Sequence, residues 1–292
     1  MPVTGAVPEA VVTLLAAATL FTVMFSLGIG VGWVDFRWAG GHARYLAKGL
    51  FCVLVAAPAI ALLVARVLGL SREAEIGVVL MAIAPGAPIA LRRSVDAGGH
   101  RSFAPALQIL LALLAVVSMP ASIAALDELY AGTASIAPWD VAKQVFVAQL
   151  LPIGLGMLFH TTLPAQAVRL APHLARISKV LLALLVIVVL VDVSEVVVRA
   201  GSRIALSIGL TTIMLLAVGH WFGGPERSTR TAVAISSAMR NPGLALLVAT
   251  VNGAPAVVIA TVLAYVVVSA FIVLPYVLWQ RRRASQRGEQ IA

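Results

Sequence analysis

The stretch ISSAMRNPGLALLVA, residues 235–249, places an arginine, an asparagine and a proline in the middle of an otherwise apolar run. Proline lacks a backbone donor and clashes with the preceding helical turn, so a helix is interrupted here, at Pro242 and Gly243. A second stretch, EIGVVLMAIAPGAPIALRR at residues 75–93, is interrupted at mid-length by Pro85, Gly86 and Pro88. These two interrupted helices decide the fold that we expect.

The composition indicates a membrane protein. Of 292 residues, 61% are hydrophobic and only 11% are charged, which excludes an ordinary water-soluble domain. Apolar runs of about 20 residues, enough to cross about 30 Å of hydrocarbon, recur along the whole chain. We therefore expect an all-α polytopic membrane protein, a single unit over residues 1–292. Its nine transmembrane helices are expected at roughly 8–30, 44–67, 73–97, 102–124, 139–162, 173–199, 202–222, 228–250 and 255–281.

The basic residues follow a membrane topology. Fifteen lie in the loops after spans one, three, five and seven or in the C-terminal tail, and five lie on the opposite side. The positive-inside rule then predicts an integral plasma (inner) membrane protein with the N-terminus outside and the C-terminus in the cytoplasm. The net charge of +9 thus indicates contact with membrane lipid and not with nucleic acid. The one basic residue outside this pattern is Arg240.

The two interrupted spans, the third and the eighth, cross the membrane in opposite directions because an odd number separates them. Unpaired backbone groups are costly in lipid, so the breaks must face protein or a water-filled cavity. Such a matched antiparallel pair is typical of the inverted repeats of secondary transporters, whose sites lie at the midplane. We expect a first repeat of four helices at 8–124 and a second of five at 139–281. The alternative is two ordinary proline kinks.

Four segments resemble the bile acid:sodium symporter family. APGAPIALRRSVDAGG (84–99) and AMRNPGLALLVA (238–249) resemble its two broken helices, and LFTVMFSLGIGV (20–31) and QLLPIGLGMLF (149–159) resemble two further segments. The resemblance implies a core domain in which the broken helices cross and a panel domain that moves against it in alternating access. By this analogy, spans one, five, six and nine form the panel, and the other spans form the core.

The sequence departs from the family at the residues that bind sodium. Sodium-coupled members carry a glutamate, a glutamine, a serine–asparagine pair and two hydroxyl residues, which fall here on Ser236, Arg240, Ala90 with Leu91, and Ala104 with Gln108. Hard cations need several oxygen ligands, which alanine and leucine do not supply. We expect no metal site, no cofactor and no use of the two-sodium mechanism.

Arg240 is the main candidate residue. It lies about 18 Å into span eight at a rise of about 1.5 Å per residue, near the midplane, where an ionisable side chain is a candidate for function. Asn241 and Pro242 suit the start of a new half-helix, whose free N–H groups favour anions. Three roles remain open: Arg240 contacts an anionic substrate, replaces a sodium ion, or pairs structurally with Asp192 or Glu195.

Other polar residues near the breaks are weaker candidates. Arg92 and Arg93 either line the cytoplasmic half of the pathway or anchor a helix end at the membrane surface, and Asp96 has the spacing to pair with them. Polar contacts to a substrate are also expected from Ser236, Ser237 and Gln108.

The carboxylates of span six, Asp192 and Glu195, allow two interpretations. Carboxyl groups in a membrane cavity can carry protons, so proton coupling is one of them. The other is an ion pair with Arg199, one helical turn further on.

No motif for catalysis or ATP hydrolysis is present: the sequence has no Walker A motif, no G-x-S-x-G and no i, i+4 histidine pair. We expect a secondary transporter of a small organic anion, not an enzyme. A sodium- or proton-coupled symporter of organic acids or bile-acid-like solutes is one alternative, and a non-transporting membrane sensor is another. The sequence leaves the substrate, the direction of transport and the oligomeric state open.

Overall fold

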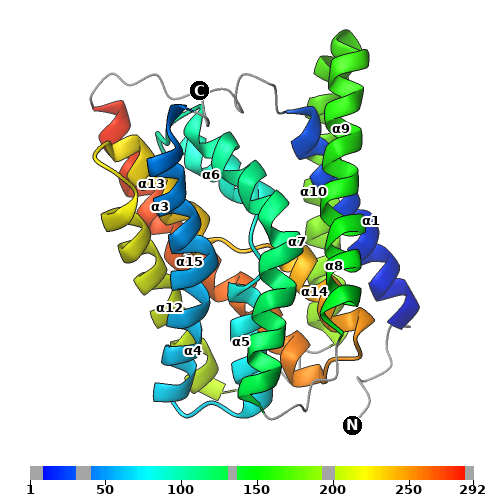
Figure 1. The fold of residues 1–292 in the computed structure, drawn as a ribbon, viewed down its shortest axis with the longest axis vertical. Helices are drawn as coiled ribbons and strands as arrows, with labels where there is room; N and C mark the ends of the chain where they lie inside the picture. Colours follow the sequence, from blue (N-terminus) through cyan, green and yellow to red (C-terminus); the bar gives the residue numbers. More distant parts are fainter. Residues whose placement is uncertain (1–8, 31–40, 131–136, 193–200, 287–292) are drawn as a thin grey trace.

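The computed structural model of the chain describes residues 9–30, 41–130, 137–192 and 201–286, and every regular element in these ranges is helical. Short π-helical turns, η1 and η2, interrupt two of the helical spans, and Figure 1 shows how the helices are arranged. The elements are α1 (Glu9–Ile29), α3 (Ala43–Phe51), η1 (Cys52–Ala56), α4 (Ala57–Val67), α5 (Arg72–Ala82), α6 (Pro88–Asp96), α7 (Phe103–Leu129), α8 (Pro138–Val145), η2 (Phe146–Leu150), α9 (Leu151–Thr162), α10 (Pro164–Asp192), α12 (Gly201–Phe222), α13 (Arg227–Ala238), α14 (Pro242–Val251) and α15 (Ala256–Ser285).

The prediction of an all-α polytopic membrane protein is confirmed. Eight helical stretches of the described residues are long and apolar enough to cross a membrane. The third expected span is the broken pair α5 and α6, which is too interrupted to count as one of these stretches. The sixth span begins earlier than we expected, because α10 starts at Pro164 and continues through the more polar residues before 173.

The two broken helices cross, as the sequence predicted. Residues 83–87, the first break, separate α5 from α6, and residues 239–241, the second break, separate α13 from α14. The Asn241 N–H donates a hydrogen bond of 3.0 Å to the Ala84 carbonyl, which joins the breaks directly. In Figure 1, α6 and α13 lie toward the end of the molecule where α15 finishes at Ser285, and α5 and α14 lie toward the other end. We call the end with α6 and α13 the basic end, because Arg92, Arg93, Arg227 and Arg230 lie on these two half-helices. The repeat boundaries at 8–124 and 139–281 remain predictions.

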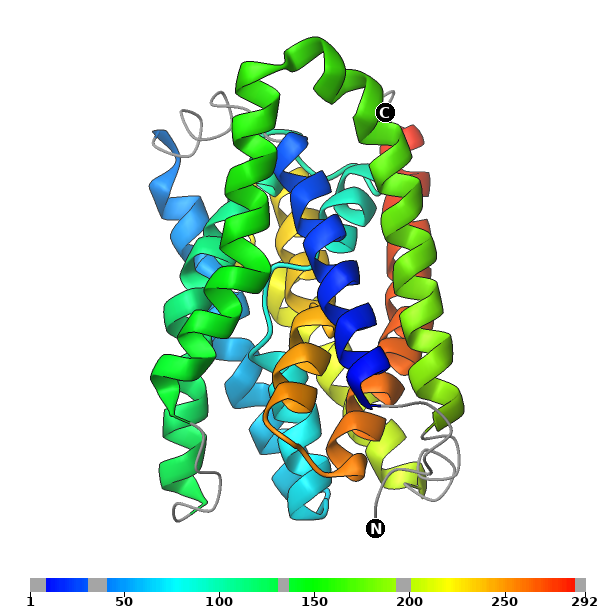
Figure 2. The same ribbon diagram turned by 90° about the vertical axis from the view of Figure 1, so that its right-hand side faces the viewer.

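Helices α1, α9 and α10 form a panel, with α1 lying between the other two (Figure 2). The α1–α9 contact depends on glycine. A Cβ on Gly28 would lie 2.2 Å from the Ile153 carbonyl oxygen, and one on Gly156 would lie 2.4 Å from the Phe25 carbonyl oxygen. Only glycine permits backbones to approach so closely, so these residues fix spans one and five together. The placement of spans one, five and six in the panel agrees with this packing.

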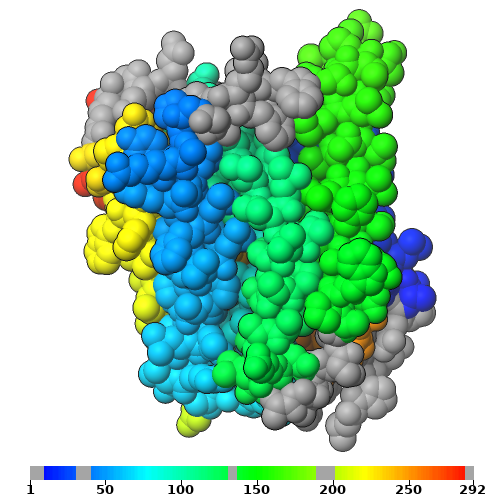
Figure 3. All heavy atoms as spheres, in the orientation of Figure 1, coloured from blue at the N-terminus to red at the C-terminus, as the bar shows by residue number. Residues whose placement is uncertain are grey.

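The placement of span nine in the panel is wrong. Helix α15 packs mainly against α5, α12 and α14, so it belongs to the core. Gly77 explains the close approach, because a Cβ at this position would lie only 2.6 Å from the Thr261 Cβ. The continuous span of α3, η1 and α4 lies beside α7 on the face shown in Figure 3, and these helices contact the crossing half-helices α5, α6 and α13.

Candidate functional site

A cavity of about 470 Å³ lies between the panel helices α1 and α10 and the half-helices α6 and α14. Both half-helices begin with a proline at their first position, Pro88 and Pro242, and both prolines line the cavity. Two helix N-termini from antiparallel segments therefore meet in one space. Most of the walls are apolar, with contributions from Leu20, Val23, Leu27, Ile89, Leu91 and Leu182.

The first turn of α14 leaves few donors free. The Asn241 Oδ1 accepts the Leu244 N–H at 3.2 Å, and the Asn241 carbonyl accepts the Ala245 N–H at 3.1 Å. Pro242 has no N–H, so the Gly243 N–H is the donor of this turn that these bonds do not use. Among the described residues, the Asn241 Nδ2 has no hydrogen-bond partner, although the residue is only 3% exposed. Asn241 and Gly243 both line the cavity, so these two donors belong to residues of its wall.

Charged side chains are found toward the outer part of this cavity. Arg92 and Lys179 are exposed and line it together with the half-buried Asp96. Arg93 is exposed but is not part of the lining. The predicted pairing of Asp96 with these arginines is wrong, because neither arginine forms an ion pair with it within 4.0 Å.

Arg240 lies in the second break but does not line the cavity. It is 3% exposed, and its Nη1 donates a hydrogen bond of 3.1 Å to the Val53 carbonyl in η1. Among the described side chains, no carboxylate lies within 4.0 Å of it. The two carboxylates proposed as its structural partners or as proton carriers, Asp192 and Glu195, have side chains outside the described residues.

Ser236 and Ser237 lie in α13, one of the crossing half-helices, and Gln108 lies in α7; all three are buried and none of them lines the cavity. The Gln108 Nε2 donates to the Ser236 Oγ at 3.0 Å and so links α7 to α13. The Ser237 Oγ is buried without a partner in the described part of the chain. These residues therefore belong to the helix packing around the crossing and are not part of the cavity lining.

Gln149 is a buried polar residue that we did not predict as a site residue. It is fully buried in η2, and both polar atoms of its amide lack a partner among the described residues. A Cβ on Gly86 would lie 3.0 Å from its Nε2, so the amide lies against the first break. Gly86 has a φ of 78°, a conformation that favours glycine. A glutamine inside an apolar span was the signal available in the sequence.

A second cavity, of about 640 Å³, opens at the opposite end of the molecule. Its lining includes Arg72, Glu73 and Asp127 near the helix ends, and it extends inward to Ile83 in the first break. Ala87, at the other end of the same break, lines the first cavity. The crossing therefore separates two cavities that lie on opposite sides of it.

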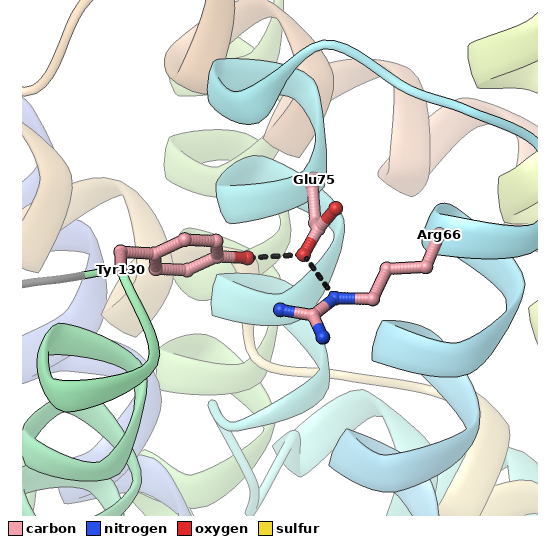
Figure 4. A network of polar contacts seen from close by, with 3 residues as sticks. All are labelled: Arg66, Glu75 and Tyr130. Carbon is pink, nitrogen blue, oxygen red and sulfur yellow. Dashed lines mark hydrogen bonds and ion pairs between the residues drawn. The ribbon is translucent and has the colours of Figure 1, made fainter.

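A polar network holds helix ends together beside the second cavity (Figure 4). The Glu75 Oε1 accepts hydrogen bonds from the Arg66 Nε at 3.1 Å and from the Tyr130 hydroxyl. Arg72 also donates to the Tyr130 carbonyl at 2.7 Å. Burial, and then the hydrogen bond to Glu75, raise the pKa of Tyr130 above its ordinary value. The network ties α4, α5 and the end of α7 into one unit.

Comparison with known proteins supports the family indicated by the broken helices. A model described as the sodium bile acid symporter family matches residues 17–200. A protein from Oryza sativa subsp. japonica, named "Probable sodium/metabolite cotransporter BASS2, chloroplastic", is 25% identical over 241 residues. The alignment covers 79% of this chain but only 56% of that protein, so the chain spans little more than half of its relative's length. Because the family match extends over more than half of the chain, the protein belongs to the sodium bile acid symporter family of membrane transporters.

Proposed function

We propose that the protein is a secondary transporter that moves small organic anions by alternating access, without the family's two-sodium mechanism. One observation carries this proposal: the half-helices α6 and α14 direct their N-termini into the same cavity. A helix N-terminus behaves as about half a positive charge, and its free N–H groups bind anions. Two such termini, with the Asn241 Nδ2 in the second break, which has no partner among the described residues, favour a carboxylate or a similar group.

The rest of the cavity supports a solute with an apolar body. Its volume of about 470 Å³ falls in the range of small-molecule sites, about 300–1,000 Å³. Leucine, isoleucine and valine side chains form most of the walls, while Arg92 and Lys179 attract anions toward the entrance. Amphipathic monocarboxylates or sulfonates are thus the preferred substrate class.

The two cavities support alternating access. Each ends at the first break, one at Ile83 and the other at Ala87, so the crossing acts as the barrier between them. We propose that the panel of α1, α9 and α10 moves against the core to open one cavity and close the other. The positive-inside rule places the basic end, and with it the cavity that holds the half-helix N-termini, toward the cytoplasm.

Sodium independence rests on the side chains at three of the positions where sodium-coupled relatives carry oxygen ligands. Ala90 and Ala104 are fully buried and Leu91 lines the anion cavity, and none of them offers a side-chain oxygen. The name of the rice relative favours a second candidate, sodium-coupled cotransport. Uptake into proteoliposomes in sodium and in choline buffers separates the two: we expect equal rates, and a large fall in choline would establish sodium coupling.

The anion selectivity needs a separate experiment. We would compare counterflow of an amphipathic carboxylate with that of its uncharged amide in proteoliposomes that contain the purified protein. The carboxylate should exchange and the amide should not. Equal exchange of both would refute an anion site, and binding of carboxylates without any counterflow would favour a membrane sensor instead of a transporter.

A further inference from the structure

The π-helical turn η1 presents a backbone carbonyl to the crossing. The Ala57 N–H bonds to the Cys52 carbonyl, five residues back, and not to the Val53 carbonyl, four residues back. The next donor in a π-helical pattern would be residue 58, which is a proline and has no N–H. The Val53 carbonyl is consequently left without an intrahelical donor in a residue that is only 1% exposed. A buried carbonyl in this state requires a donor from elsewhere.

Arg240 supplies that donor. Its Nη1 lies 3.1 Å from the Val53 carbonyl oxygen, while the main chain of the next residue, Asn241, bonds to Ala84 in the first break. The second break is thereby attached to two separate parts of the core, through a side chain at residue 240 and through the backbone at residue 241. These attachments immediately precede Pro242, where the half-helix α14 begins at the cavity.

The positive charge of Arg240 lies close to the proposed anion site. Its guanidinium is buried, bonds to a neutral carbonyl, and meets no carboxylate in the part of the chain that the structure describes. It is one residue away from Asn241, which lines the cavity, but it does not line the cavity itself. In a low-dielectric surrounding, an unneutralised cation at this distance raises the affinity of an adjacent site for anions.

We infer that Arg240 is a positioning residue that acts as a built-in cation: it fixes the second break to the Val53 carbonyl and adds positive charge behind the anion site. This inference rests on the proposed function for its effect on transport, but the attachment to η1 does not depend on it. Arg240 acts through Asn241 and the start of α14 and does not touch the solute. A carrier with such a permanent cation needs no bound metal ion at this place.

Chemical rescue tests the inference. Arg240→Ala opens space for a free cation of the same shape, so we would measure thermal unfolding and anion affinity with and without millimolar methylguanidinium. We expect the variant to unfold at a lower temperature and to bind anions at least tenfold more weakly, and methylguanidinium to restore much of both. Choline, which cannot donate hydrogen bonds from its ammonium group, should restore neither. Wild type should be unaffected by either ion.

A second variant covers the case in which Arg240→Ala does not fold. Arg240→Met retains most of the side-chain volume but removes the charge and the donor, so it should raise the KM for anions while Arg240→Lys, which keeps the charge, recovers part of the loss. A wild-type KM in Arg240→Met would overturn the inference. The inference would also be overturned if Asp192→Asn or Glu195→Gln raised the KM for anions as much as Arg240→Met does, because one of these carboxylates would then be the partner of Arg240.

The two proposals fail in different ways. If the wild-type protein transported no anion at all, the proposed function would fall, whereas rescue of the unfolding temperature of Arg240→Ala by methylguanidinium would still support the attachment to η1. If anions were transported but methylguanidinium restored neither stability nor affinity, the anion site would stand and the role of Arg240 as a cation would be refuted.

Discussion

Replacing Asn241 with serine separates the two roles that the structure gives to this side chain. The Oδ1 caps α14 through the Leu244 N–H, and the Nδ2, which has no partner in the described part of the chain, is the donor that we propose for the solute. Serine is about as good an N-cap as asparagine but has no amide group. Asn241→Ser should therefore preserve the helix start and remove the proposed solute donor.

The expected magnitude follows from the lost hydrogen bond. A hydrogen bond to a charged group contributes about 1.5–3 kcal/mol, and each 1.4 kcal/mol is about a tenfold change in affinity. Asn241→Ser should therefore weaken anion binding roughly 10- to 150-fold. Asn241→Asp keeps the cap and adds a negative charge. At about 5 Å and an effective dielectric constant of about 20, repulsion of an anionic solute adds about 3 kcal/mol, which is a further factor of more than about 100.

Two measurements on the purified variants check this reasoning. Scintillation proximity with a labelled carboxylate gives the Kd, and thermal unfolding in detergent gives the stability. We expect Asn241→Ser to unfold within about 0.5 kcal/mol of wild type, since the cap is retained, while its Kd rises as calculated. If Asn241→Ser bound the anion within a factor of two of wild type, or if Asn241→Asp bound it better, the Nδ2 would not be a solute contact.

The further predictions concern three other parts of the fold. Tyr130→Phe should lower stability by about 1–3 kcal/mol because the Glu75 acceptor loses a donor. Because the pKa of Tyr130 is raised in the folded protein, its hydroxyl stays protonated above pH values of about 10, the ordinary pKa of tyrosine. Wild-type stability should therefore fall as the pH rises beyond about 10. Thermal unfolding of Tyr130→Phe should not show this fall. Gly156→Val should separate α1 from α9 and abolish counterflow, whereas Gly154→Val, where a Cβ meets nothing within 4 Å, should leave it unchanged. Gln108→Leu should leave the buried Ser236 hydroxyl without its donor and lower the unfolding free energy by about 1–3 kcal/mol, measured in the same detergent.

The broken helices were predictable because proline acts locally. Pro88 and Pro242 each begin a half-helix whatever surrounds them, since a proline at the first helical position loses no hydrogen bond. The depth of both breaks follows from the length of the apolar runs. For the same reason, the cap at Asn241 could be assigned from the residue order alone.

The partners of polar side chains could not be predicted in the same way. The hydrogen bond from Arg240 to Val53 joins residues 187 positions apart, and it depends on a π-helical turn that hydrophobic periodicity does not reveal. The packing of span nine was likewise missed, because it is decided by the contact of Gly77 with Thr261, between helices that are distant in the sequence. Local sequence rules determine where helices break, whereas such long-range contacts determine what the breaks face.

The location of the solute tests the central claim most directly. A structure of the protein in complex with a brominated carboxylate, with anomalous data collected at the bromine edge, would fix the position and orientation of the bound molecule. We predict its carboxylate within hydrogen-bond distance of the Asn241 Nδ2 and the Gly243 N–H, and its brominated body against Leu20 and Leu182. A carboxylate bound instead to the Arg240 guanidinium, or in the second cavity, would contradict the account.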